Sequence, residues 1–256
     1  MDFDEALKEI AARDCGAENA EKVVECWKLW SDGIRHYVST NPDQYGPFRI
    51  GPAYPLLYQK EAVLQSPPYA HFGGNHICQT MYNYDINKRA NLDFEIESLS
   101  EMERLYREGA KILEEILPTL SGRQYEETKR LWALGSFIAN AAHTTVNVKR
   151  WFIQKCRILP PKTNRPIWSG GQSEDVEGGA EVSLTREEKQ EIVKKMHAIA
   201  ADEIENAGRT IPLVEYDSRL GYEPSMEYMC DRKHLEWKIA MTERALTELD
   251  EELAKA

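Results

Sequence analysis

Apolar residues recur every three or four positions over most of the chain, which is the spacing of one face of an α-helix. No segment alternates between apolar and polar residues for long enough to predict a sheet. The fold class is therefore all-α, an antiparallel bundle of four long helices plus an N-terminal helical pair. The pair is predicted at 3–13 and 17–38, and the long helices at 98–117, 122–158, 185–207 and 231–254.

Local signals mark several ends of these helices. Gly16 follows the first helix in the usual C-terminal position. The stretches 100–103 and 185–188 both read as capping boxes, in which a hydroxyl and a carboxylate satisfy each other's free backbone N–H groups. The helix at 122–158 is apolar over much of its circumference, so it is predicted to lie at the centre of the bundle.

Long irregular loops rich in aromatic residues, Gly and Pro separate the helices. They are predicted at 40–96, 159–183 and 208–230. Irregular stretches of this length are uncommon in a compact domain and are usually functional or docked on a neighbour. We expect a single helical domain over 1–256, made of the N-terminal helical pair (3–38), an irregular segment (40–96) and the helical bundle (98–256).

Composition and charge narrow the function classes. The 256 residues carry a net charge of −11, which disfavours nucleic-acid binding because phosphates repel an acidic protein. No apolar run approaches the ~20 residues needed to span a bilayer, and the acidic N-terminus does not resemble a signal peptide. The five cysteines are widely spaced and odd in number, which predicts free thiols in a reducing, cytoplasmic setting rather than disulfides or a zinc site.

Motifs for cofactors and metals are absent from the sequence. It contains no phosphate-binding glycine motif, no nucleophile elbow and no His-Glu-x-x-His. The nearest approach to a di-iron pattern is a single Asp231-x-x-His234, and Asp231 is more simply read as a helix cap. His71 and His76, five apart in a glycine-rich loop, are a weak metal pair. We expect no cofactor and no metal.

A polar stripe interrupts the apolar central helix. Asn140, His143, Asn147 and Arg150 are spaced by three, four and three residues, so they share one face. Burying such a face requires hydrogen-bond partners. Three interpretations stay open: a buried hydrogen-bond network that ties the irregular segments to the bundle, a surface that faces a ligand or another domain, and ordinary solvent exposure.

The most distinctive stretch is 44–58, where Pro and Gly alternate with aromatic residues. Tyr45 offers a flat apolar face with a polar tip, and Arg49 a planar fork of donors, which are groups that hold sugars. The alternative is a loop that packs on its own bundle.

A second such loop covers 215–228 and contains Arg219 and Tyr222 as candidate ligand-binding residues. Asp217, Glu223 and Glu227 are candidates for the carboxylate pair of a glycosidase, but salt bridges to nearby arginines are the simpler interpretation.

These same stretches carry a family resemblance. Residues 20–37, 44–56 and 217–228, together with 234–238, resemble the C-terminal helical region of large bacterial glycoside-hydrolase-like proteins of β-hexosaminidase-like and α-glucuronidase-like architecture. In such proteins a sugar-cleaving barrel lies upstream. This chain has no βα repeats, so the resemblance carries over no catalytic residue.

The resemblance implies an accessory helical domain that packs on a catalytic barrel domain absent from this chain and lines its carbohydrate-binding cleft. The expected ligand-binding surface contains Tyr45, Arg49, Asn140, His143, Asn147, Arg150, Arg219 and Tyr222. Two alternatives remain: a ligand-free interaction or homo-oligomerisation module, and a self-sufficient hydrolase that uses the carboxylates of 217–227.

Overall fold

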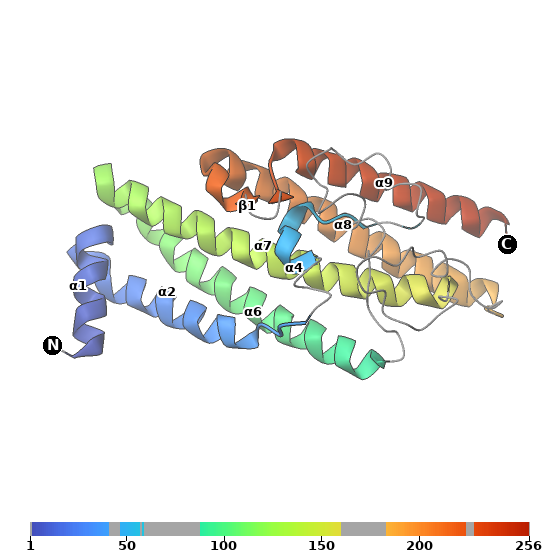
Figure 1. The fold of residues 1–256 in the computed structure, drawn as a ribbon, viewed down its shortest axis with the longest axis horizontal. Helices are drawn as coiled ribbons and strands as arrows, with labels where there is room; N and C mark the ends of the chain where they lie inside the picture. Colours follow the sequence, from blue (N-terminus) through green and yellow to red (C-terminus); the bar gives the residue numbers. More distant parts are fainter. Residues whose placement is uncertain are drawn as a thin grey trace.

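The computed structural model describes residues 2–40, 47–56, 58, 88–159, 183–223 and 228–255, except for the side chains of residues 49, 223, 228, 229 and 255. Four long helices lie side by side and alternate in direction along the chain (Figure 1). This confirms the all-α fold class and the antiparallel bundle. The four are α6 (Arg89–Ile116), α7 (Gly122–Ile158), α8 (Arg186–Tyr216) and α9 (Arg232–Lys255).

The N-terminal helical pair is also present. α1 (Phe3–Cys15) contacts α2 (Ala20–Gly33) and α7, and α2 lies along α6 (Figure 1). Short 3-10 turns, η1 (Ala17–Asn19) and η2 (Ile34–His36), precede and follow α2. α1 starts in a capping box formed by Asp2 and Glu5, and Gly16 ends it at a φ of 92°, a conformation that favours glycine.

The start of α6 corrects one expected boundary. The helix begins at Arg89, inside the segment predicted to be irregular, and the supposed capping box at 100–103 lies within it. The reason is that Leu92 is buried in line with Leu99 and Met102, so the apolar stripe extends the helix by two further turns. After η7 (Leu117–Thr119), α7 starts and ends where the periodicity predicts.

The end of α8 corrects a second boundary. The Thr185 capping box forms as predicted, with Glu188 N–H donating to Thr185 Oγ1 at 3.2 Å. The helix then runs to Tyr216 rather than ending near 207, and it passes through Pro212. A proline inside a helix removes one hydrogen bond. Burial of Leu213 and Val214 just beyond it offsets that loss.

The remainder of the predicted loop 208–230 is compact where it is described. η8 (Ser218–Gly221) leads into β1 (Tyr222–Glu223), which pairs antiparallel with β2 (Tyr228–Met229). Within the described residues, the strands are β1 and β2 of this short two-stranded ladder. It returns the chain from the end of α8 to the start of α9.

The segment 47–58 is a core element of the bundle. It forms α4 (Pro47–Ile50) and η3 (Gly51–Ala53), and η3 contacts α7, α8 and α9 (Figure 1). Tyr54, Leu56 and Tyr58 are at most 2% exposed. They join one hydrophobic cluster with residues of all three helices, including Trp151, Met196 and Leu235. The part of the Pro/Gly stretch that is described therefore packs on its own bundle.

A tryptophan joins α2 to the hairpin of α6 and α7. Trp30 stacks on Tyr106 with ring centroids 5.7 Å apart, and its Nε1 donates to the Tyr106 carbonyl at 3.0 Å. Gly109 and Gly135 face the indole so closely that a Cβ would come within 2.3 Å and 2.1 Å of it, respectively. The two glycines make the room in which the indole lies.

Candidate functional site

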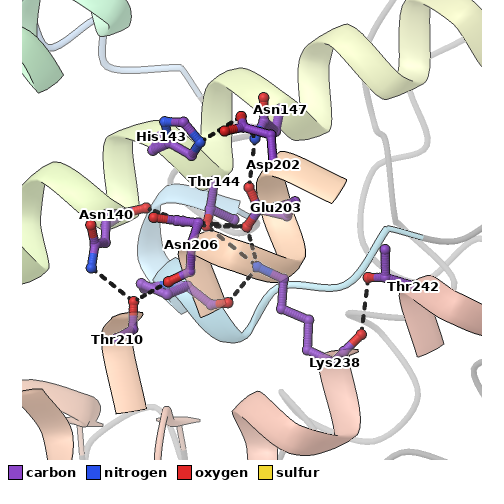
Figure 2. Close-up of polar contacts among 12 residues, drawn as sticks. Asn140, His143, Thr144, Asn147, Asp202, Glu203, Asn206, Thr210, Lys238 and Thr242 are labelled. Carbon is purple, nitrogen blue, oxygen red and sulfur yellow. Dashed lines mark hydrogen bonds and ion pairs between the residues drawn. The ribbon is translucent and has the colours of Figure 1, made fainter. Parts of the chain in front are cut away.

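The polar stripe of α7 leads into a set of buried polar side chains that α8 and α9 complete (Figure 2). Each of these side chains is at most 1% exposed. We call them the buried polar cluster: Asn140, Thr144 and Asn147 of α7, Glu203, Asn206 and Thr210 of α8, and Lys238 and Thr242 of α9.

Lys238 and Glu203 form the centre of the cluster. Lys238 Nζ pairs with Glu203 Oε1 and also donates to the backbone carbonyl of Pro52 at 2.5 Å. Thr144 Oγ1 donates to Glu203 Oε1 at 2.5 Å, and Asn147 Nδ2 donates to Glu203 Oε2 at 2.8 Å. Both carboxylate oxygens therefore accept hydrogen bonds, as a buried charge requires. The pair also fixes the segment 47–58 against α8 and α9.

Amides extend the cluster toward the C-terminal end of α8. Asn206 Nδ2 donates to the carbonyl of Asn140 at 3.0 Å and to Thr144 Oγ1 at 2.9 Å. Asn140 Nδ2 donates to Thr210 Oγ1 at 2.9 Å, and Thr210 in turn donates to the Asn206 carbonyl. Asn140 Oδ1 is buried and has no hydrogen-bond donor among the described residues.

A charged rim lies beside the cluster, between α6 and α8. His143 Nδ1 is 2.8 Å from Glu103 Oε1, and His143 Nε2 is 2.7 Å from Asp202 Oδ2. Arg107 Nε donates to the same Glu103 oxygen at 2.7 Å. Burial alone would raise the pKa of Glu103, but hydrogen bonds and charges from His143 and Arg107 outweigh it and hold the pKa below its ordinary value.

The predicted site residues on α7 thus divide into two groups. Asn140, His143 and Asn147 come together, the two amides inside the cluster and the imidazole at its rim, only 12% exposed. Arg150 is exposed and lies outside the cluster. Asn140, His143 and Asn147 thus have the buried hydrogen-bond network that was one of three interpretations, and Arg150 has the solvent exposure that was another.

The predicted residues after α8 lie on the surface. Arg219 donates two hydrogen bonds to the Asp217 carboxylate, at 2.8 Å and 2.6 Å, and the Arg219 side chain is 75% exposed. These hydrogen bonds hold the pKa of Asp217 below its ordinary value. Tyr222 is 55% exposed. Asp217 is therefore engaged in a salt bridge, the simpler of its two interpretations.

Several predicted residues fall outside the described part of the chain. Tyr45 and Glu227 are among them, as are His71 and His76, and the side chains of Arg49 and Glu223 are not described. Arg49 is placed only by its backbone, in α4.

Sequence reasoning missed the two charged residues at the centre. Glu203 lies seven residues after the buried Met196 and three after Ala200, and Lys238 lies three after Leu235. Each therefore occupies a core-facing position of its helix. The signal that could have revealed both residues is a charged side chain in an apolar helical stripe, because such a side chain requires a buried partner.

A hollow lies where α7 and α9 end and α8 begins. Its described walls are mostly aliphatic, with Lys189 and Glu252 as the charged members; the others are Tyr58, Ile158, Leu159, Leu184, Val193, Leu249 and Leu253. None of these described lining residues is a predicted site residue.

Chemistry by the buried polar cluster would require access that the structure does not offer, because its members are sealed between three helices and η3. Among the described residues, no group of three or more His, Cys, Asp or Glu side chains is placed to hold a metal ion. None of the described helices has a stretch long and apolar enough to cross a membrane.

Comparison of the chain with protein-family models, curated proteins and solved structures finds no match.

Proposed function

We propose that this chain is an accessory helical domain of a carbohydrate-active enzyme, which packs on a catalytic barrel domain that the sequence does not contain. The carbohydrate class comes from the sequence resemblance at 44–56 and 217–228. The structural support is that the polar face of α7 serves internal contacts, which suits a domain whose role is to pack rather than to catalyse.

The observation that carries the proposal is the exposed pair at the end of α8. Arg219 and Tyr222 lie three residues apart in one of the resembling stretches, 217–228, and both side chains are open to solvent. A tyrosine face stacks on the C–H surface of a sugar ring, and a guanidinium donates to hydroxyl or carboxylate groups. A surface of this kind suits the edge of a sugar cleft.

A second candidate function, a ligand-free interaction or oligomerisation module, is favoured by α1. Phe3 is 74% exposed and Ile10 is 42% exposed. They are seven residues apart, so they lie on one face of the helix. A second copy of the chain covering this face would bury both.

The test is a glycan array probed with the chain, with Arg219→Ala and Tyr222→Ala as variants and Arg89→Ala as the control. Arg89 is also an exposed arginine in an ion pair, but it lies at the start of α6. We expect the first two variants to lose most of the sugar binding and the control to keep it. Sugar binding that neither variant alters would overturn the surface role.

Light scattering and a panel of chromogenic glycosides separate the alternatives. A monomer that binds sugars but does not cleave glycosides is the result expected for an accessory domain. A stable dimer without sugar binding would favour the oligomerisation module, and cleavage by the isolated chain would favour a hydrolase that uses the 217–227 carboxylates.

A further inference from the structure

One histidine stands between two carboxylates from different helices. His143 belongs to α7, Glu103 to α6 and Asp202 to α8, and the two N···O contacts are 2.8 Å and 2.7 Å (Figure 2 shows the contact with Asp202). The side chain of Glu103 is 17% exposed and that of Asp202 is 45% exposed. His143 Nε2 has no hydrogen-bond partner among the described residues, so its contact with Asp202 Oδ2 acts through charge.

The proton count of imidazole decides what this arrangement needs. Neutral imidazole has one N–H and one lone pair, whereas imidazolium has two N–H groups. Because Arg107 also donates to Glu103 and favours its charged form, the Nδ1 contact requires a donor. In the neutral ring with its proton on Nδ1, Nε2 carries a partial negative charge and lies 2.7 Å from the Asp202 carboxylate, which is repulsive. In the imidazolium both contacts are attractive.

We propose that His143 is a pH-dependent clasp that couples α6 to α8 across α7, closed when the imidazole is protonated and loosened when it is neutral. Histidine is the side chain whose charge ordinarily changes near neutral pH. The clasp joins the N-terminal layer, in which α2 lies on α6, to the layer formed by α8 and α9. It does not depend on the proposed carbohydrate function.

The other charged and polar groups around the ring favour this assignment. On α6, Arg107 shares the Glu103 oxygen with His143 and keeps that carboxylate ionised. On α8, Arg209 donates to Asn206 Oδ1, and burial and the charge of Arg107 lower its pKa. The charge of Glu203 is neutralised by Lys238 within the cluster. Asn147 Nδ2 donates to Asp202 Oδ2 at 2.8 Å.

The sign of the pH effect follows from these charges. The clasp contributes stability while His143 is protonated, and that contribution is lost as the pH rises and the ring loses its proton. At the acid end the contribution persists until the carboxylates protonate, and the lowered pKa of Glu103 moves that limit downward.

The experiment compares the whole chain with His143→Gln at pH 6 and pH 9, using urea unfolding and amide hydrogen exchange. The control is His197→Gln, because His197 also contacts a carboxylate, Asp250, at 2.8 Å but has one such partner and is 41% exposed. We expect His143→Gln to raise the unfolding constant by roughly tenfold at pH 6 and by under about threefold at pH 9. The control should change it by under about threefold at both.

Hydrogen exchange supplies the second measurement. In the wild type, protection of the amides around Glu103 and Asp202, corrected for intrinsic exchange rates, should fall between pH 6 and pH 9, and in His143→Gln it should be low at both. Glu103→Gln, which leaves the ring one carboxylate, should weaken the pH dependence. An effect of His143→Gln that is equal at the two pH values, with unchanged protection in the wild type, would overturn the clasp.

Discussion

Lys238 of α9 and Glu203 of α8 pair with each other although at most 1% of either side chain is exposed. Removing two charges from water carries a large desolvation cost, and it is tolerated only where further hydrogen bonds complete the pair. Thr144, Asn147 and the Pro52 carbonyl supply those bonds. The pair is thus the point at which three helices and the segment 47–58 hold one another.

Breaking this pair should destabilise the protein strongly. Lys238→Met leaves Glu203 charged, buried and without its cation, so we expect the free energy of unfolding to fall by about 3–5 kcal/mol. Urea denaturation followed by circular dichroism measures it. Lys233→Ala, at an exposed position of the same helix, should change it by less than about 0.5 kcal/mol.

A double variant tests whether the loss comes from the unpaired charge. Lys238→Met combined with Glu203→Leu removes both ions, so it should be more stable than Lys238→Met alone. A double variant as unstable as the single one, or less stable, would contradict the ion-pair explanation.

The glycines beside Trp30 should respond differently from a glycine with free space. In Gly135→Ala the new Cβ would lie 2.1 Å from the indole, so Trp30 must move, and we expect a loss of about 1–3 kcal/mol. Gly208, inside α8, has nothing within 4 Å of such a Cβ. Gly208→Ala should therefore stabilise by about 0.5–1 kcal/mol. Thermal unfolding of the two variants checks both signs, and a stabilising Gly135→Ala would contradict the packing of Trp30.

The stability that Asp231 contributes to the fold should depend on pH. Its Oδ1 accepts from the His234 backbone N–H at 3.0 Å, which caps α9, and lies 2.7 Å from His234 Nδ1. Burial raises the pKa of Asp231, but these hydrogen bonds outweigh it and the pKa is lowered. A lowered carboxyl pKa contributes stability above the unfolded value near ~4 and loses it as the pH falls.

Two variants separate the cap from the charge at Asp231. Asp231→Ala should cost about 1 kcal/mol at pH 7, whereas Asp231→Asn keeps a capping side chain and should cost less. Urea unfolding from pH 7 to pH 3 should show the difference between wild type and Asp231→Asn shrinking with acid. A difference that grows instead would mean that the carboxylate is not stabilised in the fold.

Two cysteines should resist alkylation in the folded protein. Burial of Cys26 and partial burial of Cys156 raise the pKa of both thiols to about 12. The thiolate is the reactive form, so at pH 8 their native reaction with iodoacetamide should be slower than that of an ordinary thiol by roughly a thousandfold. Peptide mapping by mass spectrometry, with urea-unfolded protein as the control, measures each rate. Equal rates in the two states would contradict their burial.

Helix positions followed from local patterns wherever apolar spacing and end signals agreed. The Thr185 cap and the bounds of α7 are examples, because a capping residue and a helical stripe act within a few residues of each other. Pro212 shows the limit. Its local preference is to break a helix, and only the burial of Leu213 and Val214 against the rest of the bundle overrides it.

Only part of the candidate site could be predicted from the sequence. The stripe that contains Asn140, His143 and Asn147 marks a polar face, but Glu203 and Lys238, which complete it, lie on other helices. Their pairing depends on how α8 packs on α9, and no local pattern encodes that. That the stretch containing Tyr54 and Tyr58 packs on its own bundle was one of its two interpretations, but which helices bury them depends likewise on tertiary packing.

The hydrogen bond from Lys238 to the Pro52 carbonyl joins residues 186 positions apart. On a ribosome, which makes the chain from its N-terminus, the segment around η3 emerges long before the helix that holds it. Its contacts with α7 can close earlier, but those with α9 must wait until that helix is made, and contacts this distant in sequence slow folding. Until then the aromatic residues of that segment lack the cover of α9, and uncovered apolar side chains of a nascent chain are prone to aggregation.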